Sequence, residues 1–343
     1  MRNLSVAAMV AVTGALAMTG PTLAKDYFEG KTITVVVPSG SGGTFHIYCQ
    51  LMQRHMGRHI PGNPDMIIQN RPGAGGAGSA RFMMTAAPKD GTMIAMINPG
   101  TTMTPVLRPG IGYDSKKFQW LGALSVRTYT IATYKDSPTR TMEDARNRET
   151  LLGSTGKSAT STTLPHFLNY ILGTKFKVIH GYKGGGAVNL AMERGEVEGR
   201  TNYYSGYLGV RPHWIENRQL NFLATIGPAR PEVKDVPRIR DMVKSGINRE
   251  MLDLLESNFN VGQGFYVPPG VPKEVVAILR KSFDSLVKDP EMLKEAADRK
   301  VPTWSRNWQE VEEAVRVGYG SRKEVSEKLA TILGFRKKKT SQK

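Results

Sequence analysis

The sequence predicts an α/β protein with two sheet-and-helix lobes and a helical C-terminal region. The first observation is a repeated order, in which a short apolar strand ends in a loop of small residues and a helix follows. The second is that this order, clear at residues 32–55, returns at residues 151–172. The third is that the chain is predicted to be nearly all helix from residue 272 onward. Parallel strands that end in such loops form a crevice at their carboxyl edge, so we expect a cleft between the lobes.

The first 24 residues have the features of a secretory signal peptide. Arg2 precedes an apolar run from Leu4 to Met18, and small residues follow at Thr22 and Ala24. This run is too short for a typical membrane span. We therefore expect cleavage after Ala24 and export to a bacterial periplasm. About 320 residues would remain, which is enough for two domains with proper cores.

Residues 32–55 form the clearest strand, loop and helix unit. The β-branched run from Ile33 to Val37 predicts a buried parallel strand, and apolar residues at helical spacing predict the following helix. The small-residue loop from Ser39 to Thr44 places free backbone N–H groups at the helix N-terminus, where the dipole favours an anion by about 0.3–1 kcal/mol. The alternative is a tight turn whose glycines only supply positive φ. Cys49, the only cysteine, is expected to pack inside the protein.

The next segments repeat the order of a short strand followed by a loop of small residues. Strands are predicted at 66–68 and 92–97, and each leads into a loop of small polar residues. The pattern changes near residue 120, where two strands are predicted at 120–126 and 129–134. A helix is expected at 142–148.

In the second lobe, the corresponding loop of small residues begins at residue 153. Gly156, Lys157 and Ser158 resemble the end of a phosphate-binding Walker motif, but Leu151 stands where that motif requires glycine. We therefore disfavour nucleotide hydrolysis and expect a carboxylate or phosphate site made of hydroxyls and backbone N–H groups.

Strands are then predicted at 176–179, 197–201, 221–226 and 261–267. Arg200 has two possible roles: its guanidinium points at an anion in the crevice, or it is exposed or paired at the hinge.

The formal net charge of +17 is the one unusual compositional feature. No nucleic-acid recognition motif accompanies it, and an exported chain rarely meets nucleic acid, so we expect no such partner. Residues 336–343 form a basic tail that we expect to be solvated. The remaining positive charge would attract anionic solutes or an anionic membrane face.

Histidines offer weak signals for chemistry. His55 and His59 have metal-ligand spacing, but Met56 stands where a metalloprotease carries glutamate, so we predict a solvated helix face. His166 could be drawn as a base for Ser161, although no nucleophile-elbow motif supports this. We expect no catalytic residue, no metal and no cofactor, because glycine loops without a paired acid and base favour binding over catalysis.

Six short motifs together resemble the tripartite tricarboxylate transporter receptor family, also called Bug proteins. They are Val36-Val37-Pro38, Asn70 to Gly75, Ala87 to Thr92, Gly153 to Gly156, Gly181 to Gly185, and Val267 to Pro272. The resemblance covers essentially the whole mature chain. It implies a periplasmic-binding-protein (Venus flytrap) fold, with two domains joined by two crossing segments. The implied function is reversible capture of a small organic carboxylate, which is delivered to a two-subunit membrane permease.

The resemblance also implies domain boundaries and a binding site. Domain 1 is expected at residues 25–128 and 261–335, and domain 2 at 129–260. The ligand carboxylate would contact the first loop of each lobe. The expected ligand-binding residues are Ser39, Gly42, Gly43, Thr44, Phe45, His46 and Gly75 in the first lobe, and Ser154, Thr155, Gly156, Ser158, Thr162, Tyr182, Arg200, Asn202 and Tyr203 in the second.

One position departs from the family. Family members commonly carry aspartate where this chain has His46, which argues against an amino-acid ligand and favours a plain carboxylate. Phe45, Tyr182 and Tyr203 allow an aromatic one.

Two other function classes stay open. One is an exported α/β hydrolase or transferase that acts on an anionic substrate in the same cleft. The other is a basic surface protein that works through its lysine tail. We expect a monomer.

Overall fold

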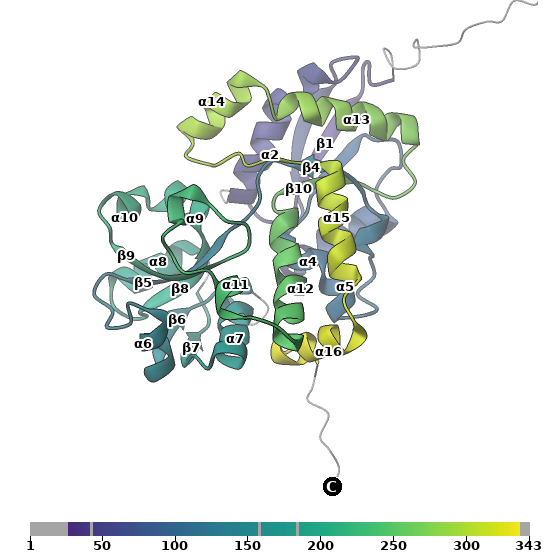
Figure 1. Ribbon diagram of the computed structural model, residues 1–343. Coiled ribbons are helices and arrows are strands. Elements are labelled where there is room, and N and C mark those ends of the chain that lie inside the picture. The colour runs from purple at the N-terminus through teal and green to yellow at the C-terminus, as the bar shows by residue number, and fades with distance from the viewer. Residues whose placement is uncertain (1–26, 42–43, 157–158, 183–184, 337–343) are drawn as a thin grey trace, which may run out of the picture.

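The computed structural model has two lobes side by side (Figure 1). It describes residues 27–41, 44–156, 159–182 and 185–336. The predicted signal peptide lies outside these residues, as does the basic tail apart from Arg336. Each lobe is built on its own sheet, and we name the lobes by these sheets.

The first lobe contains a six-stranded sheet with the order β11-β4-β10-β3-β1-β2. Strand β1 pairs in parallel with β2 and β3, whereas β10 runs antiparallel to β3 and β4. The carboxyl ends of β1, β2 and β3 therefore lie at one edge. The strands are β1 Thr32–Val37, β2 Asp65–Asn70, β3 Met93–Met96, β4 Gln119–Ala123, β10 Gly264–Val267 and β11 Arg306–Asn307.

The second lobe contains a five-stranded sheet with the order β7-β6-β8-β5-β9. Strand β6 is parallel to β7 and β8, and β5 is antiparallel to β8 and β9. The loops after β6, β7 and β8 thus share one edge. The strands are β5 Tyr129–Tyr134, β6 Thr150–Gly153, β7 Phe176–Ile179, β8 Gly199–Tyr203 and β9 Leu220–Ile226.

Helices cover both sheets, and the chain from α13 onward is mainly helical (Figure 1). This confirms the predicted α/β class with two lobes and a helical C-terminal region. In the first half of the chain the helices are α2 Thr44–His55, α3 Ala77–Thr85, α4 Pro99–Thr102, α5 Thr104–Leu107, α6 Met142–Asn147 and α7 Thr160–Leu172. The later helices are α8 Gly185–Glu193, α9 Tyr204–Val210, α10 Pro212–Glu216, α11 Ile239–Met242, α12 Ile247–Val261, α13 Lys273–Leu286, α14 Pro290–Asp298, α15 Trp308–Tyr319 and α16 Lys323–Ile332.

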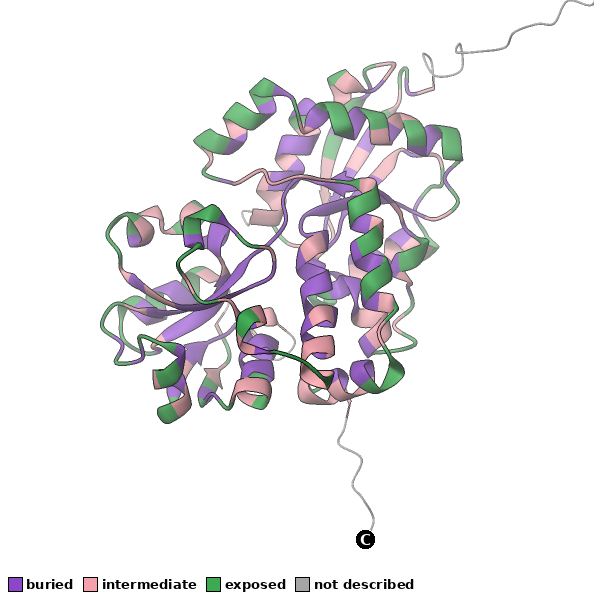
Figure 2. Cartoon of the chain, viewed as in Figure 1, coloured by how far each residue is buried: buried purple, intermediate pink, exposed green. Residues whose placement is uncertain are grey.

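The strands and the inward helix faces form the cores, while the outer helix faces are exposed (Figure 2). Cys49 is fully buried, which confirms its predicted packing role, and burial raises the pKa of its thiol. Among the described residues, no helix combines the length and apolar character that a membrane crossing requires.

The helix α12 is the main element that the sequence analysis missed. It ends at Val261, so the strand predicted from that residue is wrong at its start, and β10 begins only at Gly264. Met251, Leu254, Leu255 and Phe259 are buried at helical spacing and were the available signal. Because α12 packs against α4 and α15, we propose that the first lobe resumes near residue 247 rather than at 261.

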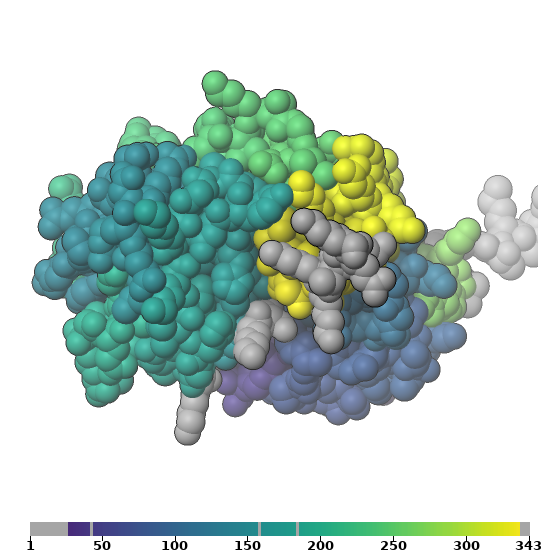
Figure 3. Space-filling view, turned by 90° about the horizontal axis from the view of Figure 1, so that it is seen from below, coloured from purple at the N-terminus to yellow at the C-terminus, as the bar shows by residue number. Residues whose placement is uncertain are grey.

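Two chain segments join the lobes, which also contact each other at the far end of the C-terminal helices. The segment 124–128 leads from β4 into β5, and the segment 243–246 leads from α11 back to α12 (Figure 1). Seen from below, the teal surface of the second lobe lies against the yellow surface of the C-terminal helices (Figure 3). There α16 packs against α7, with Lys328 Nζ 5.5 Å from the centroid of the Tyr170 ring.

Candidate functional site

Three loops of the first lobe lie together at the carboxyl edge of β1, β2 and β3. The side-chain amide of Asn70 donates to the carbonyl of Ser39 at 2.9 Å, and that of Asn98 donates to the carbonyl of Gly75 at 2.8 Å. A Cβ on Gly76, whose φ is +99°, would lie only 2.8 Å from the Cβ of Asn98. The close approach of these backbones therefore requires glycine. We call these loops, at residues 38–41, 73–76 and 98–100, the first wall.

The predicted residues of the first lobe fall on or beside this wall. Thr44, Phe45 and His46 form the first turn of α2 and are half-buried. His46 Nδ1 lies 3.4 Å from the side-chain nitrogen of Asn70, so the histidine is oriented toward the loop after β2. Ser39 is half-buried and Gly75 is exposed. Gly42 and Gly43 lie outside the described residues.

Hydroxyl groups organise the corresponding loop of the second lobe. Ser154 is fully buried, and its Oγ lies 2.7 Å from both Ser161 Oγ and Thr162 Oγ1. Thr162 Oγ1 also donates to the carbonyl of Gly156 at 2.7 Å. The cluster fastens the loop to the first turn of α7, and we call residues 154–156 and 160–162 the second wall.

Because the hydroxyls of Ser154 and Thr162 already bond to each other, these two residues hold the loop in shape. Thr155, in the same loop, is exposed, and Ser158 lies outside the described residues.

The two walls approach each other where the lobes meet. A Cβ built on Gly100, at the start of α4, would lie 3.8 Å from Thr160 Oγ1, at the start of α7. This distance is an ordinary van der Waals contact. One point of the first wall therefore lies next to the start of α7 in the second wall.

Arg200 lies in β8, in the interior of the second lobe. Arg200 is 7% exposed, so the exposed alternative is wrong. Its Nη1 donates to the carbonyl of Gly185 and to Oδ1 of Asn189, both at 2.8 Å, and its Nε has no partner in the described part of the chain. Burial lowers the pKa of this guanidinium, with the nearby tyrosines opposing the effect.

Three other predicted residues lie at strand ends of the second lobe. Asn202 is buried in β8, and Tyr203 ends that strand half-buried. Tyr182 follows β7 and is half-buried, and partial burial together with the charge of Glu196 raises the pKa of its hydroxyl.

Arg127 is a residue at the junction of the lobes that the sequence analysis did not identify. It lies in the segment 124–128, and its guanidinium carbon is 4.5 Å from the ring centroids of both Phe45 and Tyr203. It thus contacts one predicted site residue from each lobe. Only its position just before β5 could have drawn attention to it, because its ring partners are distant in sequence.

The histidines at the end of α2 do not form the solvated helix face that we expected. His55 is 8% exposed and its Nε2 lies 2.6 Å from Glu295 of α14. His59 Nε2 lies 2.7 Å from Asp289, which caps the same helix. These pairs fasten α2 to α14. In the described part of the chain, no group of three or more His, Cys, Asp and Glu side chains could hold a metal ion.

The comparison with known families settles the identity at the family level. The profile described as "Tripartite tricarboxylate transporter family receptor" matches residues 50–329, which is most of the chain. The chain belongs to the tripartite tricarboxylate transporter receptor family. This confirms the resemblance found in the sequence motifs, and the family is one of transport receptors.

One relative can be aligned with this receptor over nearly its full length. A UPF0065 protein of Cupriavidus necator is 25% identical over 335 residues, which cover 94% of this chain and 95% of that protein.

Two solved structures from Rhodopseudomonas palustris share the fold. MatC with bound malate has a TM-score of 0.64 and 20% identity, with 88% of this chain and all of that one covered. A second protein, with adipate, has a TM-score of 0.65 and 19% identity over 89% and 98% of the two chains.

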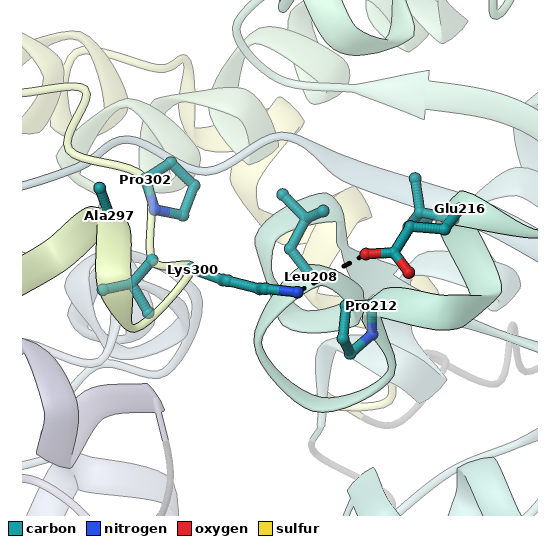
Figure 4. Close-up of a pocket in the computed structure, with 8 residues that line it drawn as sticks. Leu208, Pro212, Glu216, Ala297, Lys300 and Pro302 are labelled. Carbon is teal, nitrogen blue, oxygen red and sulfur yellow. Dashed lines mark ion pairs between the residues drawn. The ribbon is translucent and has the colours of Figure 1, made fainter.

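The receptor also has an apolar groove between its lobes, separate from the two walls (Figure 4). Leu208 and Pro212 from α9 and α10 face Ala297 and Pro302 from the end of α14 and the loop after it. Lys300 Nζ lies 3.5 Å from Glu216 and joins the two sides. None of the predicted ligand-binding residues lines this groove.

Proposed function

We propose that this receptor binds a small organic carboxylate between the two walls and delivers it to a two-subunit membrane permease. The observation that carries the proposal is the convergence of strand-end loops from both lobes, seen where Gly100 approaches Thr160. We further propose that the protein works in the periplasm as a monomer after removal of residues 1–24, and that it performs no catalysis. The malate and adipate bound by two structural neighbours support the choice of ligand class.

The walls suit an anion for a simple electrostatic reason. Helices α2 and α7 both begin at these loops, and the first N–H groups of a helix have no partner within it. The positive end of each helix dipole therefore lies at the cleft. Arg200 adds a buried positive charge on the side of the second lobe.

Five of the proposed ligand-binding residues fall into two groups by what they do. Ser154 and Thr162 hold the second wall in shape, and the backbone around them binds the carboxylate. Phe45, Tyr182 and Tyr203 supply apolar surface for the rest of the ligand. The full proposed set is Ser39, Gly42, Gly43, Thr44, Phe45, His46, Gly75, Ser154, Thr155, Gly156, Ser158, Thr162, Tyr182, Arg200, Asn202 and Tyr203.

A thermal-shift experiment on the mature protein tests this function. Malate, adipate and benzoate would be compared with the uncharged diamide of adipate at the same concentration. A ligand at 100 times its Kd stabilises a protein by about 2.7 kcal/mol, which raises Tm by several degrees. We expect such a rise with at least one carboxylate and none with the diamide.

Mass spectrometry of the recovered ligand separates binding from catalysis. We expect the stabilising carboxylate to be recovered unchanged after prolonged incubation. Equal effects of carboxylates and diamide would reject the proposal, and conversion of the ligand would favour an exported enzyme instead.

A further inference from the structure

Arg127 is a buried cation at the junction of the two lobes. The residue is only 3% exposed. Its backbone N–H donates to the carbonyl of Phe259 at the end of α12, at 3.1 Å, and the neighbouring Val126 donates to the carbonyl of Trp304 at 3.0 Å. The backbone around this residue is therefore held by α12 and by the segment before β11.

Aromatic rings from both lobes hold the guanidinium. Phe45 comes from the first turn of α2 and Tyr203 from the end of β8, and each ring centroid lies 4.5 Å from the guanidinium carbon. A planar cation between two rings is attracted to both faces and has a defined orientation. Because the rings belong to different lobes, the geometry of this contact depends on how far the lobes are closed.

The polar contact of Arg127 is a neutral amide. With the Gln263 amide oriented by its hydrogen bonds, the side-chain oxygen accepts from Arg127 Nε at 2.9 Å and from Nη2 at 3.0 Å. The amide nitrogen donates to the carbonyl of Ser125 at 2.6 Å, which fixes this orientation. The amide satisfies two N–H groups but leaves the positive charge uncompensated.

No carboxylate among the described residues pairs with Arg127. The internal positions outside the description cannot supply one either, because 42–43, 157–158 and 183–184 contain only Gly, Lys and Ser. A buried charge without a counter-ion is unfavourable, and proteins normally compensate it. Of the other buried arginines, Arg230 follows this rule by pairing with Glu232 at 2.8 Å, whereas Arg200 bonds only to a carbonyl and an amide among the described residues.

We propose that Arg127 binds a carboxylate of the ligand directly and is the charge that sets the preference for anionic ligands. The inference rests on the proposed function and adds to it the residue that supplies the counter-charge. The ligand carboxylate forms a charge-assisted hydrogen bond with the guanidinium while Phe45 and Tyr203 hold it from the two lobes. Binding of the anion thereby favours the closed arrangement in which both rings contact Arg127.

Isothermal titration calorimetry of Arg127 variants tests the inference. The probes are malate and adipate, each compared with its own monoamide, which lacks one negative charge. We expect Arg127→Gln to weaken binding of the dicarboxylate at least 50-fold and to remove its advantage over the monoamide. Arg127→Lys, which keeps the charge but not the planar group, is expected to bind with intermediate affinity and to retain the preference.

Arg280→Gln is the matched control. Arg280 of α13 is stacked over Trp308 at 3.6 Å and paired with Glu312 at 2.7 Å, so it resembles Arg127 in stacking but has its carboxylate within the protein. We expect its affinity for the dicarboxylate to stay within twofold of wild type.

The outcomes separate the two proposals. Suppose that the wild type binds a dicarboxylate and that folded Arg127→Gln either binds it equally well or loses affinity for the dicarboxylate and the monoamide by the same factor. The inference then fails and the receptor function stands. If Arg127→Gln does not fold, Arg127→Lys decides, because loss of the charge preference in that variant also overturns the inference. If the wild type binds no carboxylate, the proposed function fails and the inference fails with it.

Discussion

Two groups of charged residues in this receptor differ in whether their positive charges have carboxylate partners. At the end of α2, each positively charged or protonatable side chain meets a carboxylate: Arg58 and His59 meet Asp289, and His55 meets Glu295. At the junction of the lobes, Arg127 meets two aromatic rings and an amide, and inside the second lobe Arg200 meets a carbonyl and an amide. The first group is electrically balanced within the chain, and the second is not.

This difference separates structural charge from binding charge. A balanced cluster stabilises the fold and has no unpaired charge for a ligand, whereas a buried cation without a counter-ion is unfavourable until an anion arrives. Changes in the α2–α14 cluster should therefore alter stability and leave affinity intact. Changes at Arg127 should lower the affinity for the ligand.

The largest stability effect is expected from Asp289→Ala. This carboxylate bonds to Arg58 and His59 and caps α14 by accepting from the backbone N–H groups of Glu291 and Met292. Losing both roles should lower the free energy of unfolding by about 2–4 kcal/mol. Urea unfolding measures this loss, and calorimetry of the folded variant should give a wild-type Kd. A large loss of affinity would show that the cluster is not purely structural.

Acid should weaken the same cluster to a smaller extent. Burial opposes ionisation of Asp289, but hydrogen bonds from Arg58 and His59 outweigh it and lower its pKa below the ordinary value of 3.8. The carboxylate therefore stabilises the fold above about pH 4, and this contribution is lost as the pH falls toward the folded pKa. Melting curves between pH 5 and about pH 3 should show a steeper loss of Tm for wild type than for Asp289→Ala. Parallel curves would contradict this account.

The smallest effect is expected at the apolar groove. Glu216 and Lys300 pair at 3.5 Å, but their side chains are 64% and 55% exposed. Exposed pairs contribute little, so Glu216→Gln should change the free energy of unfolding by less than about 0.5 kcal/mol. A change above about 1 kcal/mol in urea unfolding would mean that this pair helps to hold the lobes together.

Local sequence features predicted much of the sheet structure. The predicted strands 129–134 and 176–179 coincide with β5 and β7, because apolar and β-branched residues form these strands in any context that buries them. The glycine loops were located for a similar reason, since glycine and small polar residues end strands wherever they occur. By contrast, α12 was missed although its buried residues follow helical spacing.

The roles of individual charged residues were harder to predict. His55 and Glu295 are 240 positions apart, and His59 and Asp289 are 230 apart, so the pairs are invisible in local sequence. Spacing alone suggested a solvated face. The partners of Arg127 likewise come from α2, β8 and the residues before β10.

By itself, the sequence predicted most of the strands and glycine loops, the family and the bilobal architecture, because these follow largely from residue patterns within a few positions of each other, but it did not reveal α12. The tertiary structure decided which charges are paired and which are not, and it brought Gly100 within reach of Thr160. Charge compensation acts through space between residues far apart in the chain, and only folding fixes those distances.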